Sequence, residues 1–443
     1  MSEIEKRTIA KVSARLVLFL VVCYFVAYLD RVNVGSAALT MNKALGLSSS
    51  AFGFGAGIFF IAYFFFEVPS NLFLAKFGAR RWIARIMITW GILSGAMAFI
   101  PQISNATGLS PEYTFYAVRV LLGAAEAGFF PGIIFFLTLW FPGVYRARIV
   151  GMFMAAIPLS TVIGSPISAY LLQFDGAMGL AGWQWLFIVE AAPALIMAVA
   201  VLAYLTDSPA EATWLENDER AWLSSTLAAE ARQREAARSM SVVETLLNPH
   251  VLALALVYFG AVASNYGVGF FMPQIVKAFG YSDTITLLIT AIPYAIGAVG
   301  MIWYGRRSDE KVERKGHAAV ALLIAAVGLI AATLTTDPLM KMTAFSISAF
   351  GVFAVLPVFW TLPTSFLSGP AAAAGIAIIN ALGNLSGFAG PYAMGALKDY
   401  TGNYNSGLLL IAGFVLISMV TVLLLKHDSS LESVAPAKRT LVE

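Results

Sequence analysis

The sequence has 443 residues, of which 59% are hydrophobic and 12% are charged. Soluble domains carry roughly a quarter charged residues, so this composition excludes an ordinary soluble protein and predicts a polytopic membrane protein. The net charge of +3 argues against a nucleic-acid surface. A lone cysteine, Cys23, excludes an intramolecular disulfide, and the three histidines are scattered, so we expect neither a metal site nor a cofactor.

Apolar segments long enough to cross a membrane recur along the whole chain. A spanning helix needs about 20 mainly apolar residues. The polar start, MSEIEKRTIAKVSAR, leads directly into the first such segment without a cleavage site, so we expect that span to stay as an anchor. The sequence predicts an all-α protein with twelve spans, near residues 16–40, 51–75, 82–101, 113–140, 146–173, 184–206, 250–277, 284–305, 317–336, 341–364, 371–397 and 405–426.

The distribution of Lys and Arg predicts the orientation of these spans. Cytoplasmic loops carry an excess of Lys and Arg. If both termini are cytoplasmic, most of the 28 cations fall inside, and the outer loops hold only Lys43, Lys277, Lys341 and Lys398. Arg31 and Arg119 are left within the membrane. We therefore expect a multi-pass protein of the cell inner membrane with both termini in the cytoplasm.

A polar, helix-prone segment divides the spans into two sets of six. It covers 207–249 and is predicted to be a cytoplasmic linker between a first bundle, 1–206, and a second bundle with a short tail, 250–443. The halves share weak repeats. NLFLAKFGARR (71–81) follows span 2 and GRRSDEKVERK (305–315) follows span 8, while IGSP (163–166) in span 5 corresponds to AGP (389–391) in span 11.

These features resemble the major facilitator superfamily. Its loop motif is visible as Gly305, Asp309, Arg314 and Lys315, whereas the first copy has Asn71 and Ala75 at the glycine and aspartate positions. YLDRVNVG (28–35), AYFFFEVPSN (62–71), RVLLGAAEAGFFPG (119–132) and NALGNLSGFAGP (380–391) are similar to the anion:cation symporter family. That family includes tartrate, phthalate, hydroxyphenylacetate and sugar-acid permeases. The resemblance implies two pseudo-symmetric six-helix bundles and transport of a small organic anion.

Charged residues deep inside the predicted spans, away from their ends, lie only in the first half. A charge at mid-bilayer costs roughly 2.5–3.5 kcal/mol on insertion scales, so each must be paired, hydrated or used. The set comprises Asp30, Arg31, Glu67, Arg119, Glu126 and Glu190. Span 7 has the uncharged SNYGVG (264–269) where span 1 has LDRVNVG. We therefore expect the first half to couple transport to an ion and the second half to shape substrate recognition.

The depth of these residues predicts a pairing. At 1.5 Å per residue, Asp30 and Arg119 lie at similar depths, so the two could meet. Adjacent helical residues diverge by about 100°, which leaves Arg31 for a ligand. We expect Arg31 to bind the substrate carboxylate, and Asp30 and Glu126 to carry protons. Arg119 is expected to act as the charge partner of Asp30. The alternative is that Asp30 and Arg119 form a static pair that only orients two spans.

The remaining candidates are weaker. Glu67 and Glu190 are interpreted as structural, and Glu67 is expected to pair with an arginine of the adjacent basic loop. The resemblance adds Tyr28, Tyr63, Trp360 and Asn380 as substrate contacts. Further polar or amphipathic groups at suitable depth are Asn265, Tyr266, Tyr294, Thr361 and Asn384.

The combined prediction is a proton-coupled symporter for the uptake of a small carboxylate, such as tartrate, an aromatic acid or a sugar acid. It would act as a monomer within the lipid bilayer by alternating access. Protons are preferred over sodium because the charged set resembles that of proton-coupled bacterial members. The alternatives are proton-coupled efflux of a drug or organic cation, and a membrane sensor. An enzyme is not expected, because no nucleophile, histidine and acid constellation occurs.

Overall fold

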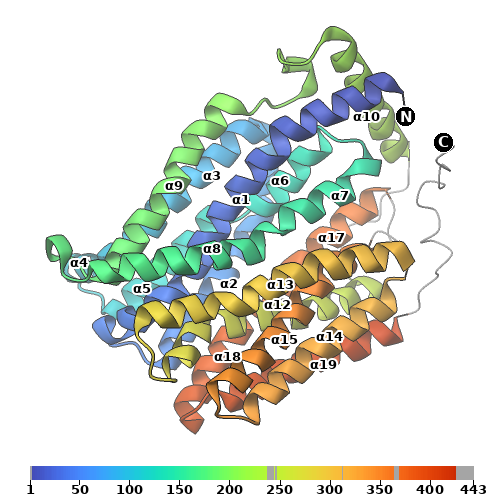
Figure 1. Cartoon of the computed structure of the whole chain (residues 1–443). Helices are drawn as coiled ribbons and strands as arrows, with labels where there is room; N and C mark the ends of the chain where they lie inside the picture. Colours follow the sequence, from blue (N-terminus) through green and yellow to red (C-terminus); the bar gives the residue numbers. More distant parts are fainter. Residues whose placement is uncertain (1, 237–243, 245–246, 312, 364–368, 426–443) are drawn as a thin grey trace.

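The computed structural model describes residues 2–236, 244, 247–311, 313–363 and 369–425. Within these ranges every regular element is a helix. Figure 1 shows the helices of the first half, α1 to α9, along one side of the molecule and those of the second half, α12 to α19, along the other. The prediction of an all-α protein is therefore confirmed for the described residues.

The first half consists of nine helices and three short 3-10 turns. They are α1 (Glu3–Leu45), α2 (Ser49–Phe77), α3 (Ala79–Ala96), η1 (Met97–Phe99), α4 (Ile100–Thr107), α5 (Pro111–Glu126), α6 (Phe129–Thr138), α7 (Gly143–Met154), α8 (Ala156–Leu171), η2 (Leu172–Phe174), η3 (Ala177–Gly179) and α9 (Gly182–Tyr204). Predicted spans 4 and 5 are each divided into two helices, α5 with α6 and α7 with α8.

The segment between the halves and the second half are also helical. They contain η4 (Pro209–Glu211), α10 (Asn217–Ala236), α12 (Pro249–Lys277), α13 (Asp283–Lys311), α14 (Lys315–Thr333), α15 (Pro338–Phe359), α17 (Gly369–Asn384), α18 (Ser386–Thr401) and α19 (Asn405–Leu424). In the described ranges, 11 helices are long and apolar enough to cross a membrane. The remaining predicted span, span 11 at 371–397, is covered by α17 and α18 together. The predicted tail beyond 425 lies outside the described residues.

The helix α10 docks on the start of α1. Arg7 Nε donates to Glu219 Oε1 at 3.0 Å, and Lys11 Nζ donates to Glu219 Oε2 at 2.9 Å. The Glu219 side chain is fully buried by these contacts. Arg146 of α7 donates to Glu230 at 3.0 Å and so adds a second attachment. The described part of the predicted linker is thus held against the first half, while residues 237–243 and 245–246 lie outside the description.

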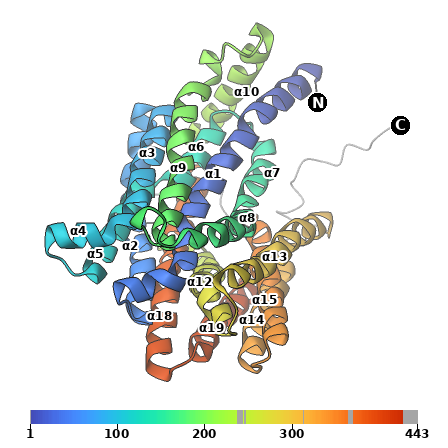
Figure 2. The ribbon, with the colours of Figure 1, turned by 60° about the vertical axis from the view of Figure 1, so that its left-hand side comes forward.

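The two halves are joined at the end of the molecule far from α10, where α2 packs on α18 and α8 packs on α13. Figure 2 shows α10 and α18 at opposite ends. Asp399 of the second half accepts hydrogen bonds from Ser50 N at 2.7 Å and Ser50 Oγ at 2.6 Å. Gly53 stands so close to the Pro391 carbonyl that a side chain would not fit. These contacts close that end of the molecule. The bundle boundaries at residues 206 and 249 stay a proposal.

Candidate functional site

An ion pair between Arg31 and Glu126 lies at the centre of the molecule. Both side chains are buried, and Arg31 donates from Nε and Nη2 to Oε1 of Glu126. Arg31 also donates from Nη1 to the Tyr266 hydroxyl of the second half at 3.0 Å. The guanidinium therefore bonds to both halves of the protein at once. Its planar fork suits such divided recognition, which a lysine could not reproduce.

A break in the fourth span places Glu126 at this position. Helix α5 ends at Glu126, Ala127 is extended, and Gly128 has φ +85° before α6 begins. A positive φ is readily adopted only by glycine, and a side chain at Gly128 would also collide with Ser70. The glycine therefore fixes the turn that leaves the Glu126 carboxylate at the end of a helix, facing Arg31.

The predicted contact between Asp30 and Arg119 is wrong. Asp30 instead accepts hydrogen bonds from Trp90 Nε1 at 2.7 Å and Ser94 Oγ at 3.0 Å, both on α3. Arg119 donates to the backbone carbonyls of Gly55 at 3.2 Å and Ala56 at 2.8 Å, both on α2. The reason is helix adjacency, because α5 packs mainly on α2 and α3, whereas α1 packs mainly on α8, α9 and α12. Equal depth does not bring two helices together.

Most of the predicted substrate residues surround the ion pair. The rings of Tyr28 and Tyr63 each lie 5.5 Å from the Arg31 guanidinium carbon. Asn265 donates to the Tyr28 hydroxyl at 2.5 Å, and the rings of Tyr28 and Tyr266 stack at 6.1 Å. These residues and Arg31 therefore form one buried cluster in which α1 and α2 face α12.

Three predicted residues of the second half lie outside this cluster. Asn380 donates to Glu67 Oε1 at 3.2 Å, across the interface between the halves. The Trp360 ring packs at 5.0 Å from the ring of Tyr258. Asn384 is half-buried at the last residue of α17. The expectation that Glu67 pairs with an arginine is also wrong, because its hydrogen-bond partner is Asn380.

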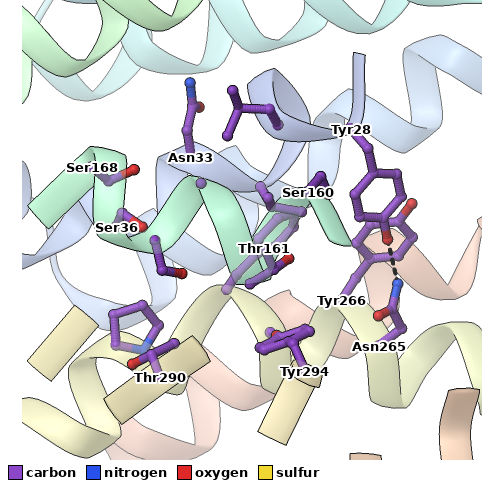
Figure 3. Close-up of a pocket in the computed structure, with 17 residues that line it drawn as sticks. Tyr28, Asn33, Ser36, Ser160, Thr161, Ser168, Asn265, Tyr266, Thr290 and Tyr294 are labelled. Carbon is purple, nitrogen blue, oxygen red and sulfur yellow. Dashed lines mark hydrogen bonds between the residues drawn. The ribbon is translucent and has the colours of Figure 1, made fainter. Parts of the chain in front are cut away.

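A narrow pocket adjoins the ion pair between α1, α8, α12 and α13. Figure 3 shows hydroxyl groups from these helices around it. Its lining contains no charged side chain among the described residues, and the hydroxyl and amide groups belong to Tyr28, Asn33, Ser36, Ser160, Thr161, Ser165, Ser168, Asn265, Tyr266, Thr290 and Tyr294. Tyr28 and Tyr266 link the pocket to Arg31. The predicted residue Tyr294 lines the pocket, whereas Thr361 does not.

The serines of this lining were missed in the sequence, although a signal exists. Ser160, Gly164 and Ser168 are spaced four residues apart, which places them on one face of α8. Leu29 of α1 packs against Gly164, so that this face approaches α1. The partners of Asp30, Trp90 and Ser94, were missed as well, and they too are spaced four residues apart.

The arrangement defines a membrane transport protein whose central polar cluster lies between two helical halves. Residues 20–391 match the family described as Major Facilitator Superfamily. The chain belongs to this superfamily, and the predictions of the family, of the fold and of a transporter rather than an enzyme are confirmed.

Named relatives are similar over nearly the whole chain. A putative tartrate transporter of Agrobacterium vitis is 52% identical over 97% of this chain and 93% of its own length. A quinolone resistance transporter of Acinetobacter baumannii is 40% identical over 94% of each chain. Among solved structures, the xylose transporter XylE from E. coli, in a partially occluded inward open conformation, has a TM-score of 0.74 at 14% identity, covering 94% of this chain and 99% of its own. That likeness concerns the fold alone.

Proposed function

We propose that this protein is a proton-coupled symporter that takes up a small hydroxylated carboxylate, tartrate or a close analogue, by alternating access. The observation that carries the proposal is the buried contact of Arg31 with Glu126 and Tyr266. A buried guanidinium held by only one carboxylate is a site at which a second carboxylate can compete. The similarity to a putative tartrate transporter supports the same substrate class.

The ion pair supplies a coupling mechanism. When Glu126 is ionised, it occupies the guanidinium and no substrate anion is needed. When Glu126 binds a proton, it loses its charge, and Arg31 is left in a buried site without a counter-ion. Because an unpaired buried charge is costly, the substrate carboxylate then takes the place of Glu126. Proton and anion therefore enter the same conformation together, and Asp30 is proposed as a further proton carrier.

The hydroxyl-lined pocket supports the substrate class. An acid anchored at Arg31 would extend past Tyr28 and Tyr266 into a lining of Ser, Thr, Tyr and Asn side chains. These groups donate and accept hydrogen bonds, so they match the hydroxyls of a hydroxy acid. A site built for hydroxyl groups discriminates strongly against analogues that lack them, because its own polar groups are then left unpaired.

The remaining parts of the proposal concern cellular setting. We propose that the protein acts as a monomer in the cell inner membrane with both termini in the cytoplasm, where the excess of Lys and Arg supports the orientation. In that orientation the closed end, with Ser50 and Asp399, faces outward. The described conformation would then be closed to the outside.

Efflux is the second candidate function. A relative named as a quinolone resistance transporter is 40% identical to this chain. The same exchange between proton and substrate at Arg31 could drive export if the two ligands competed instead of binding together. The direction of proton movement that accompanies the substrate separates the two functions.

Counterflow in proteoliposomes tests the proposal. The purified protein is reconstituted, loaded with unlabelled tartrate and exposed to labelled tartrate, with succinate as the matched acid that lacks hydroxyls. We expect tartrate to exchange much faster than succinate, and to accumulate under an acid-outside gradient with alkalinisation of the medium. Glu126→Gln should keep the exchange but lose the accumulation. Failure of every carboxylate to exchange, or full accumulation by Glu126→Gln, would overturn the mechanism.

A further inference from the structure

Glu190 of α9 is a buried carboxyl group that the mechanism above does not use. Its side chain is 2% exposed. Oε1 accepts one hydrogen bond, from Ser168 Oγ at 2.7 Å. Among the described residues, Oε2 has no hydrogen-bond partner and Glu190 takes part in no ion pair. The sequence alone suggests a structural role, but the hydrogen-bond partner of Glu190 is the neutral Ser168, which supplies no counter-charge.

Within the part of the chain that the structure describes, Asp30 is the other titratable group near Glu190. Helix α9 packs on α1, α3 and α8. From α1, Asn33 lies beside Glu190 and donates to Asp30 Oδ1 at 3.5 Å, so that the amide stands between two acids. From α3, Trp90 and Ser94 donate to Asp30, and from α8 only Ser168 reaches Glu190. Among the described residues, Asp30 is therefore the charged group that faces Glu190.

The two acids differ in their supply of hydrogen-bond donors. Asp30 receives hydrogen bonds from Trp90 and Ser94 and a longer one from Asn33. Glu190 receives one hydrogen bond of good geometry, from Ser168, with the Asn33 amide close beside it. Glu190 Oε2 and Asn33 Oδ1 are two buried acceptors without a donor among the described residues. Burying an unpaired carboxylate with few donors is expensive. A proton on the Glu190 carboxyl group would remove the charge and add the donor that this cluster lacks.

We propose that Glu190 is a second proton-binding carboxyl of the transport cycle, paired with Asp30 and connected to the hydroxyl-lined pocket through Ser168. Because two buried acids on either side of one amide repel each other when both are ionised, the pair retains at least one proton. Asp30, with its three donors, carries the negative charge in the described conformation, and Glu190 carries the proton.

Ser168 provides the path between the acid and the pocket. The Ser168 side chain lines the pocket while its hydroxyl donates to Glu190, and Figure 3 shows Ser168 and Asn33 in the lining. A hydronium in the pocket can give a proton to Ser168 Oγ while Ser168 passes its own proton to Glu190 Oε1. The step leaves one water, an intact serine and a neutral acid, so its atoms and charges balance.

The proposal rests on proton coupling, but infrared spectroscopy tests it without transport. The carbonyl stretch of a protonated carboxylic acid is recorded for the purified full-length chain at neutral pH, and the spectrum of Glu190→Gln is subtracted. We expect a protonated-acid band in the difference spectrum. Glutamine donates where the protonated acid would, so this variant keeps the neutral state and its fold. An empty difference spectrum would overturn the proposal.

A second variant and a transport measurement complete the test. Ser168→Ala removes the hydrogen bond to Oε1, so the same band should shift in frequency, and an unshifted band would contradict the assignment even if Glu190→Gln failed to fold. In proteoliposomes, Glu190→Gln should lower the number of protons moved per substrate while exchange continues. If the unaltered protein moves no protons, proton coupling itself fails; if it does and Glu190→Gln matches it, only the role of Glu190 fails.

Discussion

Asn380 of α17 donates a hydrogen bond to Glu67 of α2 at 3.2 Å and so ties the amide of one half to the carboxyl group of the other. Both side chains are buried, and the second oxygen of Glu67 has no partner among the described residues. Tyr63, one turn earlier on α2, lies beside Arg31. The bond therefore joins the halves one helical turn away from the proposed substrate residues.

Asn380→Ala should release this tie. A buried hydrogen bond contributes about 0.5–1.5 kcal/mol, so we expect the balance between conformations to shift by roughly two- to tenfold away from the described one. Double electron–electron resonance measures the shift as a change in the distance distribution between spin labels on the exposed residues Phe73 and Ala377. Asn403→Ala, which removes an exposed amide of the same half, should leave the distances unchanged. Equal distance distributions in all three proteins would show that the bond does not hold the halves.

Arg31→Lys should abolish most uptake although it keeps the charge. Arg31 divides its donors between Glu126 and Tyr266, and a lysine ammonium has no planar fork with which to do so. We expect the rate of labelled tartrate uptake in proteoliposomes to fall by about tenfold or more, in line with the loss of one charge-assisted hydrogen bond. The control is Arg85→Lys, at a half-buried arginine that stacks on Trp82. Near-normal uptake by Arg31→Lys would remove Arg31 from the substrate site.

Asp399→Asn should favour opening of the end that is closed in the described conformation. Its carboxylate accepts hydrogen bonds from the first residues of α2, where a capping interaction contributes about 1 kcal/mol. We expect a several-fold increase in the open population, measured between spin labels at Lys43 and Tyr400. Asp283→Asn is the matched control, because Asp283 pairs with Lys277 within the second half. An unchanged distance distribution in Asp399→Asn would rule out this contact as a latch.

The same latch should respond to acid. Burial alone would raise the pKa of Asp399, but hydrogen bonds from Ser50 and Ser49 outweigh it and lower the pKa below the ordinary value. Because the pKa is lowered, the hydrogen bonds stabilise the closed end at every pH above the ordinary pKa range of aspartate. This stabilisation is lost as the pH falls through the lowered pKa of Asp399. The unaltered protein should then approach the distances of Asp399→Asn, which should itself change little with pH.

Glu219→Gln should loosen α10 from α1 and lower the thermal stability of the purified protein. Burial alone would raise the pKa of Glu219, but the Glu216 backbone amide, Lys11 and Arg7 lower it. A buried charged group with hydrogen bonds contributes about 1–3 kcal/mol to the free energy of unfolding. The contribution of Glu219 is therefore present at neutral pH and disappears as the pH falls through its lowered pKa. The difference in Tm from the unaltered protein should shrink in acid.

Glu216→Gln is the matched control for this measurement. Glu216 also lies near Arg7 and Lys11, but its side chain is 62% exposed. Exposed ion pairs contribute roughly 0–1 kcal/mol, so its Tm should stay close to that of the unaltered protein. If both variants lose the same stability, burial of Glu219 is not what attaches α10.

The sequence predicts the spans well because apolar length is a local property. It also marks Arg31 and Glu126, because a charge in an apolar run is visible without knowing its neighbours. It cannot show that Asp30 faces Trp90 and Ser94, since depth along a helix axis says nothing about which helix lies beside it. The sequence also does not predict the break in the fourth span at Gly128, because small residues occur throughout membrane bundles whether or not a helix ends there.

Glu67 and Glu190 show a second limit. Each stands alone in an apolar segment, and sequence reasoning assigns such a residue to structure unless a partner is visible. Their partners, Asn380 and Ser168, lie far away in the chain and carry no charge. Neutral hydrogen-bond partners leave little signal in a single sequence, so the buried polar contacts of this protein required the fold.

Helix α1 is one unbroken rod of 43 residues, or about 65 Å at 1.5 Å per residue. Arg7 and Lys11 attach one end of α1 to α10 through hydrogen bonds to Glu219. Further along the helix, Gly35 packs directly against the backbone of Phe270 in the other half. Arg31 lies one turn from that point of contact. A rigid rod that pivots near Gly35 has a short arm at the ion pair and a long arm at its start. A small rotation about Gly35 would therefore move the start of α1 much further than it moves the ion pair.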